Sequence, residues 1–161
     1  FREGLSTGIL NVQFTPMGRL LCGGTNRGWP VRGIKPFALE RLDWTGKMPF
    51  EIKSINITGD GFRITFTKPL DRATGNNIKS YKIAAFTHNY HSGYGGPEVD
   101  LNNPVVKSVE LAPDGRSSTI VLSKLKTGFV HEFDLGALRD RDNGDLLHHN
   151  AYYTVNEVPK G

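Results

Sequence analysis

The chain has 161 residues, and 20 Lys and Arg against 16 Asp and Glu give it a formal net charge of +4 at pH 7. Its 37% hydrophobic and 22% charged residues are typical of a folded domain and exclude an intrinsically disordered chain. No apolar run approaches the ~20 residues of a membrane-spanning helix, and the small charge argues against a nucleic-acid-binding surface.

The net charge is unevenly placed along the chain. Residues 1–49 hold seven Lys or Arg and three Asp or Glu, whereas residues 50–161 hold thirteen of each. We therefore expect two units, an N-terminal segment of residues 1–49 and a domain of residues 50–161.

The single cysteine, Cys22, excludes a disulfide within the chain, a zinc site of thiolates and attachment of a c-type haem. The start at Phe1, without a Met or a signal-peptide pattern, leads us to expect a piece of a longer protein.

Both parts are predicted to consist of strands, because Gly and Pro are frequent and turn sequences separate short apolar runs. In the N-terminal segment the expected strands are Ile9–Phe14, Leu20–Cys22 and Phe37–Trp44, followed by a linker at Thr45–Pro49. In the domain, Asp60-Gly61 between two alternating runs is a strong hairpin signal. The strands expected there are Ile52 with Ser54–Ile57, Phe62–Phe66, Tyr81–Phe86, Val105–Leu111, Thr119–Leu122, Phe129–Leu135 and Tyr152–Val155. This pattern predicts an all-β protein with an Ig-like β-sandwich and no helix of useful length.

Three stretches of the domain are distinctive: Phe62–Asp71, Val109–Gly115 and Leu138–Leu147. Through them residues 51–156 resemble the Ig-like modules of secreted and cell-surface bacterial proteins, and the last stretch matches the turn before the final strand of such a module. The Asp residues in this turn also look like a calcium-binding loop. Because an EF-hand pattern counted from Asp140 fails at its Gly and Glu positions, we predict a hairpin turn instead.

Four stretches at the N-terminal end of the chain are distinctive: Gly24–Trp29, Lys35–Leu42, Trp44–Lys47 and Pro49–Ile52. Together they are similar to the end of a β-propeller of the sugar-dehydrogenase-like kind, which occurs in large secreted bacterial proteins and is often fused to a c-type cytochrome. In that family the last blade leads directly into an Ig-like module that ends much as residues 151–159 do here. The resemblance implies a secreted or periplasmic bacterial protein whose parent is an oxidoreductase.

Three strands cannot close a propeller, because each blade has four strands and a propeller has several blades. Such a segment exposes strand edges unless it packs against the domain or against other parts of a larger protein. We therefore expect a partial, propeller-blade-like antiparallel sheet before the Ig-like sandwich. The alternative is that these strands simply enlarge the sandwich.

The loop between the second and third predicted strands contains Arg27, Trp29 and Arg32. The two arginines could hold an anionic ligand, or Arg27 could stack on Trp29 and fix the loop, which is the more common arrangement. In the quinone-dependent sugar dehydrogenases that the segment resembles, the last blade supplies basic contacts to the cofactor. The matching stretch Thr7–Val12 contains no Lys or Arg, so we expect no cofactor in this chain.

The segment His88–Asp100 has an unusual composition, with two His, two Tyr, three Gly and two acidic residues. Aromatic rings on a Gly-rich loop suit a sugar or a protein interface. The candidate residues are Tyr90, His91, Tyr94 and Glu98. We favour the other interpretation, a loop that covers the edge of the sandwich or packs on the preceding blade, with its Tyr rings buried. Metal binding is a weak signal, because His88 and His91 lie on opposite faces of an extended chain.

These observations predict a non-catalytic structural or interaction portion, C-terminal in a secreted multidomain protein of the redox type. Its partners would be the remaining domains of that protein or another chain. Two other functions stay open: a carbohydrate-binding module that uses the aromatic loop, and part of a sugar-oxidising enzyme completed by another chain. We expect no catalytic residue, metal site, nucleic-acid partner or membrane span within these residues.

Overall fold

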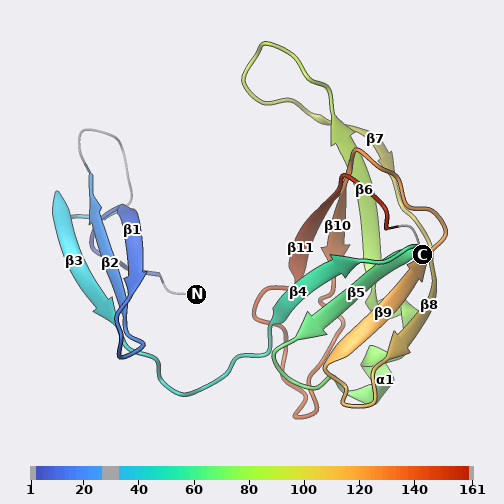
Figure 1. Cartoon of the computed structure of the whole chain (residues 1–161), viewed down its shortest axis with the longest axis horizontal. Helices are drawn as coiled ribbons and strands as arrows, with labels where there is room; N and C mark the ends of the chain where they lie inside the picture. The colour runs from blue at the N-terminus through green and yellow to red at the C-terminus, as the bar shows by residue number, and fades with distance from the viewer. Residues whose placement is uncertain (1–2, 27–32, 160–161) are drawn as a thin grey trace. The chain divides into compact units, whose positions relative to one another are not determined.

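The chain divides into two compact units, Phe1–Lys47 (unit 1) and Met48–Gly161 (unit 2), in a computed structural model that describes residues 3–26 and 33–159 (Figure 1). Unit 1 contains β1 (Ile9–Phe14), β2 (Leu20–Thr25) and β3 (Phe37–Leu42). Unit 2 contains β4 (Ile52–Ile57), β5 (Gly61–Phe66), α1 (Arg72–Gly75), the 3-10 helix η1 (Ile78–Ser80), β6 (Lys82–His88), β7 (Glu98–Asn102), β8 (Val106–Leu111), β9 (Ser117–Leu122), β10 (Phe129–Asp134) and β11 (Asn150–Val155). The predicted all-β fold, with an Ig-like sandwich after a partial blade-like sheet, is confirmed.

Unit 1 is a three-stranded antiparallel sheet in the order β1-β2-β3. A tight turn joins β1 to β2, where the Gly18 N–H donates to the Thr15 carbonyl and Gly18 adopts a φ of +74°. Strand β2 is longer than predicted, because Gly23 and Gly24 continue it instead of ending it. A side chain at Gly24 would collide with the backbone of Gly8, so the close approach of these two segments requires glycine.

Unit 2 is a sandwich of two four-stranded antiparallel sheets, β11-β10-β6-β7 and β4-β5-β9-β8. In β5, β9 and β10, alternation places every second side chain in the space between the sheets. The fully buried side chains there include Phe62, Ile64 and Phe66 of β5, Ile120 of β9 and Phe133 of β10. The rings of Phe62 and Phe133 meet edge to face with centroids 5.0 Å apart, which joins the two sheets at the centre of the core.

Strand β7 and the two short helices were not predicted. The sequence of β7, Glu98–Asn102, has one β-branched residue and two acidic ones, so it lacks the composition of a strand and forms by pairing with β6. The helices are only four and three residues long. They lead to Tyr81, whose hydroxyl donates to the Gly75 carbonyl at 2.7 Å. Burial raises the pKa of this phenol to about 12, and the nearby Ser118 hydroxyl opposes the shift only in part.

The predicted hairpin turn at 140–145 is confirmed, and it is organised by the buried carboxylate of Asp140. Its Oδ1 accepts hydrogen bonds from the backbone N–H groups of Asp142 (3.0 Å) and Gly144 (2.7 Å). Its Oδ2 accepts from Lys68 Nζ at 3.1 Å. Burial would raise the pKa of Asp140, but the hydrogen bonds from Gly144 and Lys68 outweigh it and hold the pKa below its usual value. The ion pair between Asp140 and Lys68, which follows β5, therefore connects this turn to the end of that strand.

Candidate functional site

Unit 1 exposes large apolar side chains on both faces of its sheet. Strand pairing places Phe14, Leu20 and Leu42 in one row across one face, because Phe14 lies opposite Leu20 and Leu20 opposite Leu42. Phe14 is 70% exposed. On the other face Leu39 lies opposite Gly23 and is 74% exposed, so the third strand carries an apolar residue there as well. Polar side chains such as Gln13 and Arg41 lie beside Leu39, but each face still exposes at least one large apolar side chain.

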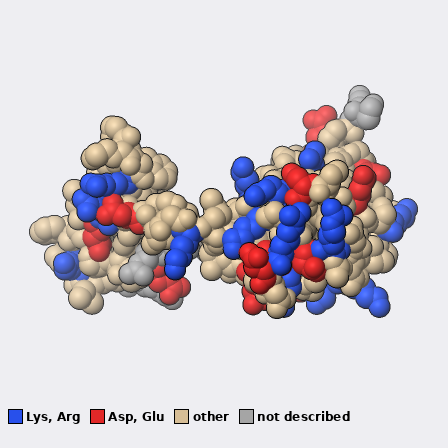
Figure 2. Space-filling model, turned by 90° about the horizontal axis from the view of Figure 1, so that it is seen from below, with Lys and Arg blue, Asp and Glu red and all other residues tan. Residues whose placement is uncertain are grey.

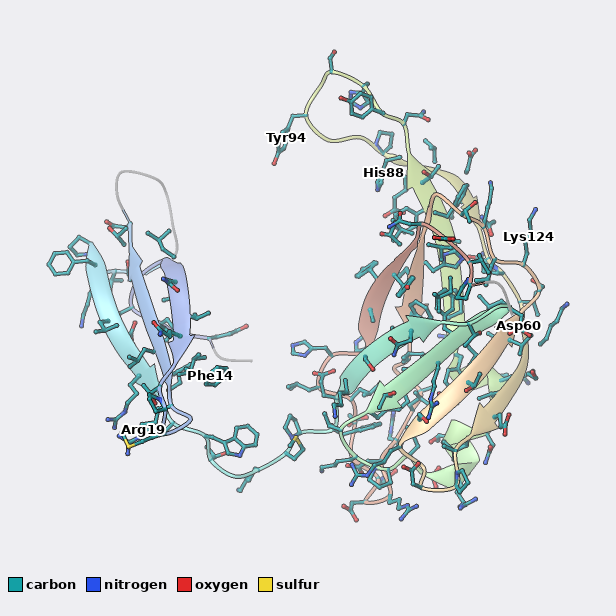
Figure 3. The ribbon with its side chains drawn as sticks, viewed as in Figure 1. Phe14, Arg19, Asp60, His88, Tyr94 and Lys124 are labelled. Atoms are coloured by element: carbon teal, nitrogen blue, oxygen red, sulfur yellow. The ribbon has the colours of Figure 1, made fainter. Side chains whose placement is uncertain are left out.

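A shallow apolar pocket of about 350 Å³ lies at the Phe14 end of this sheet. Phe14, Leu20, Leu42 and Trp44 supply its apolar lining. Asp43 stands at its rim and forms ion pairs with Arg19 (3.3 Å) and Arg41 (3.1 Å). Figure 3 shows Phe14 and Arg19 at this end of the strands. The pocket thus has an apolar lining with charged groups at its edge, a composition that is typical of protein–protein interfaces.

The residues Tyr90, His91 and Tyr94 lie in the hairpin loop between β6 and β7, and Glu98 begins β7 at its base. Figures 1 and 3 show this loop extending beyond the ends of the two sheets of unit 2. Both Tyr rings are fully exposed, at 104% and 109%. The expected burial of these rings over the edge of the sandwich is therefore wrong, because the loop extends away from that edge.

The base of the loop is held more firmly than its tip. His88 Nδ1 donates to the Pro97 carbonyl at 3.1 Å, and its ring meets Phe86 edge to face at 5.5 Å. In the loop itself the Gly93 N–H donates to His91 Nδ1 at 3.0 Å. His88 thus contacts the base of the loop, and His91 contacts a neighbour within it. Within residues 3–26 and 33–159, no three His, Cys, Asp or Glu side chains lie close enough to hold a metal ion.

The other three candidates, Arg27, Trp29 and Arg32, lie outside the described residues. Their predicted contacts, with an anion or with one another, stay predictions. The helices that the structure describes include none that is long and apolar enough to cross a membrane.

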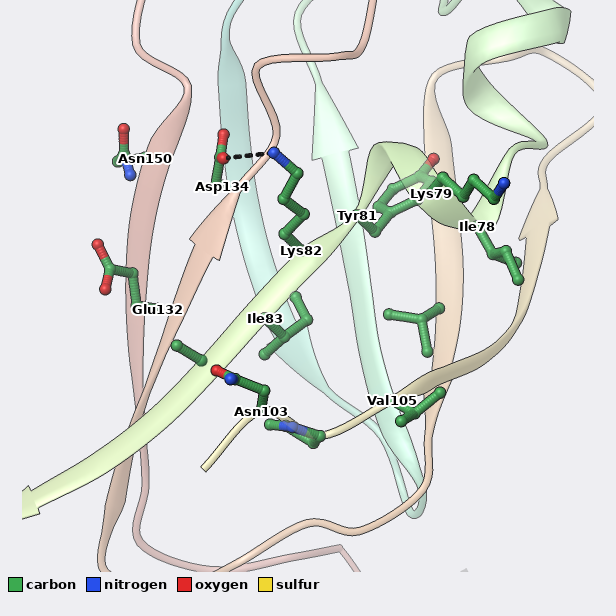
Figure 4. A pocket seen from close by; sticks show the side chains of 13 residues that line it. Ile78, Lys79, Tyr81, Lys82, Ile83, Asn103, Val105, Glu132, Asp134 and Asn150 are labelled. Atoms are coloured by element: carbon green, nitrogen blue, oxygen red, sulfur yellow. Dashed lines mark hydrogen bonds and ion pairs between the residues drawn. The ribbon is translucent and has the colours of Figure 1, made fainter. Parts of the chain in front are cut away.

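Sequence reasoning missed a groove of about 730 Å³ beside β6, shown in Figure 4. It gathers residues from η1, β6, β10, β11 and the segment between β7 and β8. Lys82 Nζ pairs with Asp134 Oδ2 at 3.4 Å across β6 and β10. Only the pairing of these two strands brings the residues together, and they are 52 positions apart. The sequence holds no local signal for this groove.

The carboxylates of this groove are engaged in hydrogen bonds. A hydrogen bond from the Gly136 N–H lowers the pKa of Asp134 against the effect of burial, and Lys82 adds to the lowering. Glu132 accepts from the Tyr152 hydroxyl at 2.9 Å, which raises the pKa of that phenol. Asp134 therefore stays ionised and ion-paired near neutral pH, an arrangement suited to holding strands together rather than to proton transfer.

No family model matches the sequence, and no curated protein matches it. Solved structures of one protein resemble the chain. The crystal structure of the N-terminal part of the bacterial S-layer protein SbsC has a TM-score of 0.52 and 25% identity, and the match covers 68% of this chain and 24% of that one. A crystal structure of a longer part of the S-layer protein SbsC has a TM-score of 0.51 and 23% identity over 68% of this chain and 14% of that one.

This chain thus spans a quarter or less of the S-layer structures that it resembles. At such low identity the likeness shows a shared β-rich fold. These neighbours are S-layer structures and not sugar-dehydrogenase-like propellers.

Proposed function

We propose that this chain is a non-catalytic structural and interaction portion of a larger extracellular or cell-surface protein. Unit 2 would serve as its β-sandwich module, and unit 1 would be covered by a partner, either other domains of the same protein or another chain. The observation that carries the proposal is the sheet of unit 1, which exposes Phe14 on one face and Leu39 on the other. Large exposed apolar patches on soluble proteins mark interaction surfaces.

A sheet that exposes large apolar side chains on both faces is expected where both faces are covered. A propeller blade meets this description, since each blade packs between two neighbours. The three strands of unit 1 and the apolar side chains exposed on both of their faces support the blade-like interpretation. The sequence resemblance supports a redox-type parent protein, whereas the likeness to S-layer structures supports a cell-surface location.

The proposal is tested by removing the apolar side chains from both faces of unit 1. We expect the wild-type chain to self-associate and to enhance the fluorescence of a hydrophobic dye, because water contact with these faces is unfavourable. The double variant Phe14→Ser, Leu39→Ser should stay monomeric in sedimentation velocity and lose most of the dye signal.

The matched control for this test is Ile78→Ser, Val105→Ser, which removes two exposed apolar side chains from unit 2. The control should behave as the wild type does. Equal dye binding and equal association of all three proteins would show that the apolar faces of unit 1 attract no partner.

A second candidate function is carbohydrate binding by the β6–β7 loop, favoured by the complete exposure of Tyr90 and Tyr94. Exposed aromatic rings provide apolar faces against which sugar rings can pack. If this function holds, neutral polysaccharides embedded in a native gel should retard the wild type but not the variant Tyr90→Ala, Tyr94→Ala. A purely structural module would migrate alike in both forms.

A further inference from the structure

A groove of about 510 Å³ on unit 2 gathers three basic side chains around hydroxyl groups. Lys53 comes from β4, Arg63 from β5, and Arg116 directly precedes β9. Thr65 and Ser117 supply the hydroxyls, whereas the Thr67 hydroxyl, which also lines the groove, already donates to the Pro49 carbonyl at 2.6 Å and accepts the Glu51 N–H at 2.9 Å. The groove lies on the outer face of the sheet β4-β5-β9-β8. Figure 2 shows one face of unit 2, on which basic and acidic side chains lie close together.

The sheet brings these residues together through its alternation and register. Phe62, Ile64 and Phe66 point into the core, so Arg63 and Thr65 between them point outward. Thr65 lies opposite Ser117 of β9 and opposite Ser54 of β4. The pairing of β4 with β5 shifts in register between Ile52 and Ser54, and the extra residue in β4 is Lys53.

The two guanidinium groups are positioned by neutral acceptors. Arg116 Nη1 donates to the Thr67 carbonyl at 2.6 Å, and Arg63 Nη2 donates to Ser117 Oγ at 3.2 Å. Each contact uses one of the five N–H donors of an arginine and leaves its charge uncompensated. The side chains are thus held in place with donors still free for a ligand.

The three cations also lack the acidic partners that other basic residues of unit 2 have. Lys68, Lys82 and Arg139 each form an ion pair with an Asp. Among the residues that the structure describes, no carboxylate oxygen lies within 4.0 Å of a charged nitrogen of Lys53, Arg63 or Arg116.

One acidic residue, Asp114, stands among the described residues that line the groove, and its Oδ1 accepts the backbone N–H of Arg116 at 2.9 Å. Three cations against this single carboxylate leave an excess of positive charge in the groove. Such an excess favours a ligand that brings negative charge.

We propose that this basic groove binds a carboxylate-bearing polysaccharide. The planar guanidinium group of an arginine can donate two parallel hydrogen bonds to one carboxylate. The hydroxyl groups that line the groove can form hydrogen bonds with sugar hydroxyls. The surface continues along the sheet as polar side chains, with Asn56 opposite Arg63 and Arg63 opposite Thr119. An extended chain therefore has further partners beyond the groove, up to Glu110 of β8, which lies opposite Thr119 and whose carboxylate bounds the surface open to an anion. This ligand goes beyond the role proposed for unit 1 and does not depend on it.

The experiment titrates the full chain with oligomers of polygalacturonate, which carry one carboxylate per sugar, by isothermal titration calorimetry at two salt concentrations. We expect binding that weakens with salt, and a loss of about tenfold or more in affinity for the variant Lys53→Gln, Arg63→Gln. Arg116→Gln should weaken binding in the same direction. The fully methyl-esterified polymer, which has the same sugars without the charge, should not bind measurably.

Matched variants separate this proposal from its rivals. The variant Lys79→Gln, Lys124→Gln removes the same charge from other parts of unit 2 and should keep the wild-type affinity. An equal loss in this control would indicate unspecific attraction and overturn the proposal, as would the absence of binding or equal binding of the esterified polymer. Loss of binding in Tyr90→Ala, Tyr94→Ala alone would assign the ligand to the β6–β7 loop, and equal binding of polyglutamate would indicate an acidic peptide instead.

Discussion

Replacing Asp140 by Ala is expected to destabilise unit 2 by about 3–5 kcal/mol, because it leaves two backbone N–H groups without an acceptor and removes the partner of Lys68. The carboxylate is 2% exposed, so water cannot readily replace it. In a domain of this size the loss lowers the thermal midpoint of unit 2 by roughly 10–20 °C. Differential scanning calorimetry of the full chain measures this shift.

The control for this prediction is Asp145→Ala, five residues along the same turn. Asp145 is exposed and pairs with Arg139 at 3.1 Å, and a surface ion pair contributes about 1 kcal/mol or less. We therefore expect a small shift for the control. Similar shifts for both variants would show that Asp140 does not organise the turn.

Asp140 also gives unit 2 a sensitivity to acid. Because its folded-state pKa lies below the ordinary 3.8, the unfolded chain takes up the proton first as the pH falls. The stabilisation is complete above the ordinary pKa and is lost as the pH falls through the folded value. The variant Asp140→Asn, which cannot ionise, should lack this contribution to acid denaturation.

Replacing His131 by Leu is expected to stabilise unit 2 by about 1–3 kcal/mol at pH 7. The His131 ring is fully buried beside Phe62, with ring centroids 5.4 Å apart, and neither of its nitrogens has a hydrogen-bond partner. An unsatisfied polar group in an apolar core costs free energy, and Leu of similar volume removes that cost. Urea denaturation followed by the amide signals of unit 2 measures the gain.

The same histidine makes unit 2 less stable in mild acid. Burial lowers the pKa of His131, and the nearby Phe129 carbonyl, which lacks hydrogen-bond geometry, opposes this only in part. As the pH falls below the ordinary 6.5, the unfolded chain binds the proton first, so stability falls by up to about 1.4 kcal/mol per pH unit until the folded ring protonates.

The variants His131→Leu and His131→Gln separate the two effects. Both lack an ionisable ring and should lose this pH dependence, whereas only Leu should raise stability at pH 7. A wild-type curve that is as flat between pH 6.5 and 5 as that of the Gln variant would contradict a lowered pKa.

The strands were predictable because most of them carry their own signals. Ile9–Phe14 was placed at its observed bounds, and Asp60-Gly61 identified the β4–β5 hairpin, where the Thr58 N–H donates to the Gly61 carbonyl. Strand β7 was not predictable, because its pairing with β6 rather than its composition makes it a strand. Local propensity locates a strand only where packing and composition agree.

The candidate sites were less predictable than the strands. The loop with Tyr90 and Tyr94 was recognised by its composition, but composition cannot tell an exposed ring from a buried one. The basic groove was missed because Lys53, Arg63 and Arg116 belong to three different segments, which only the register of the sheet unites. Of these three residues, only Arg63 carries a signal in the sequence, because it is a charged residue between the apolar residues of a predicted strand.

Because Cys22 is buried in unit 1, the reactivity of its thiol can be used to measure the opening of that unit. It is the single thiol of the chain and is 2% exposed within the sheet that partners are proposed to cover. A thiol reagent can reach it only when unit 1 opens, because reaction requires access to the sulfur. The rate of alkylation therefore measures the opening of unit 1 separately from unit 2, and slower alkylation in a mixture identifies whatever partner holds that sheet closed.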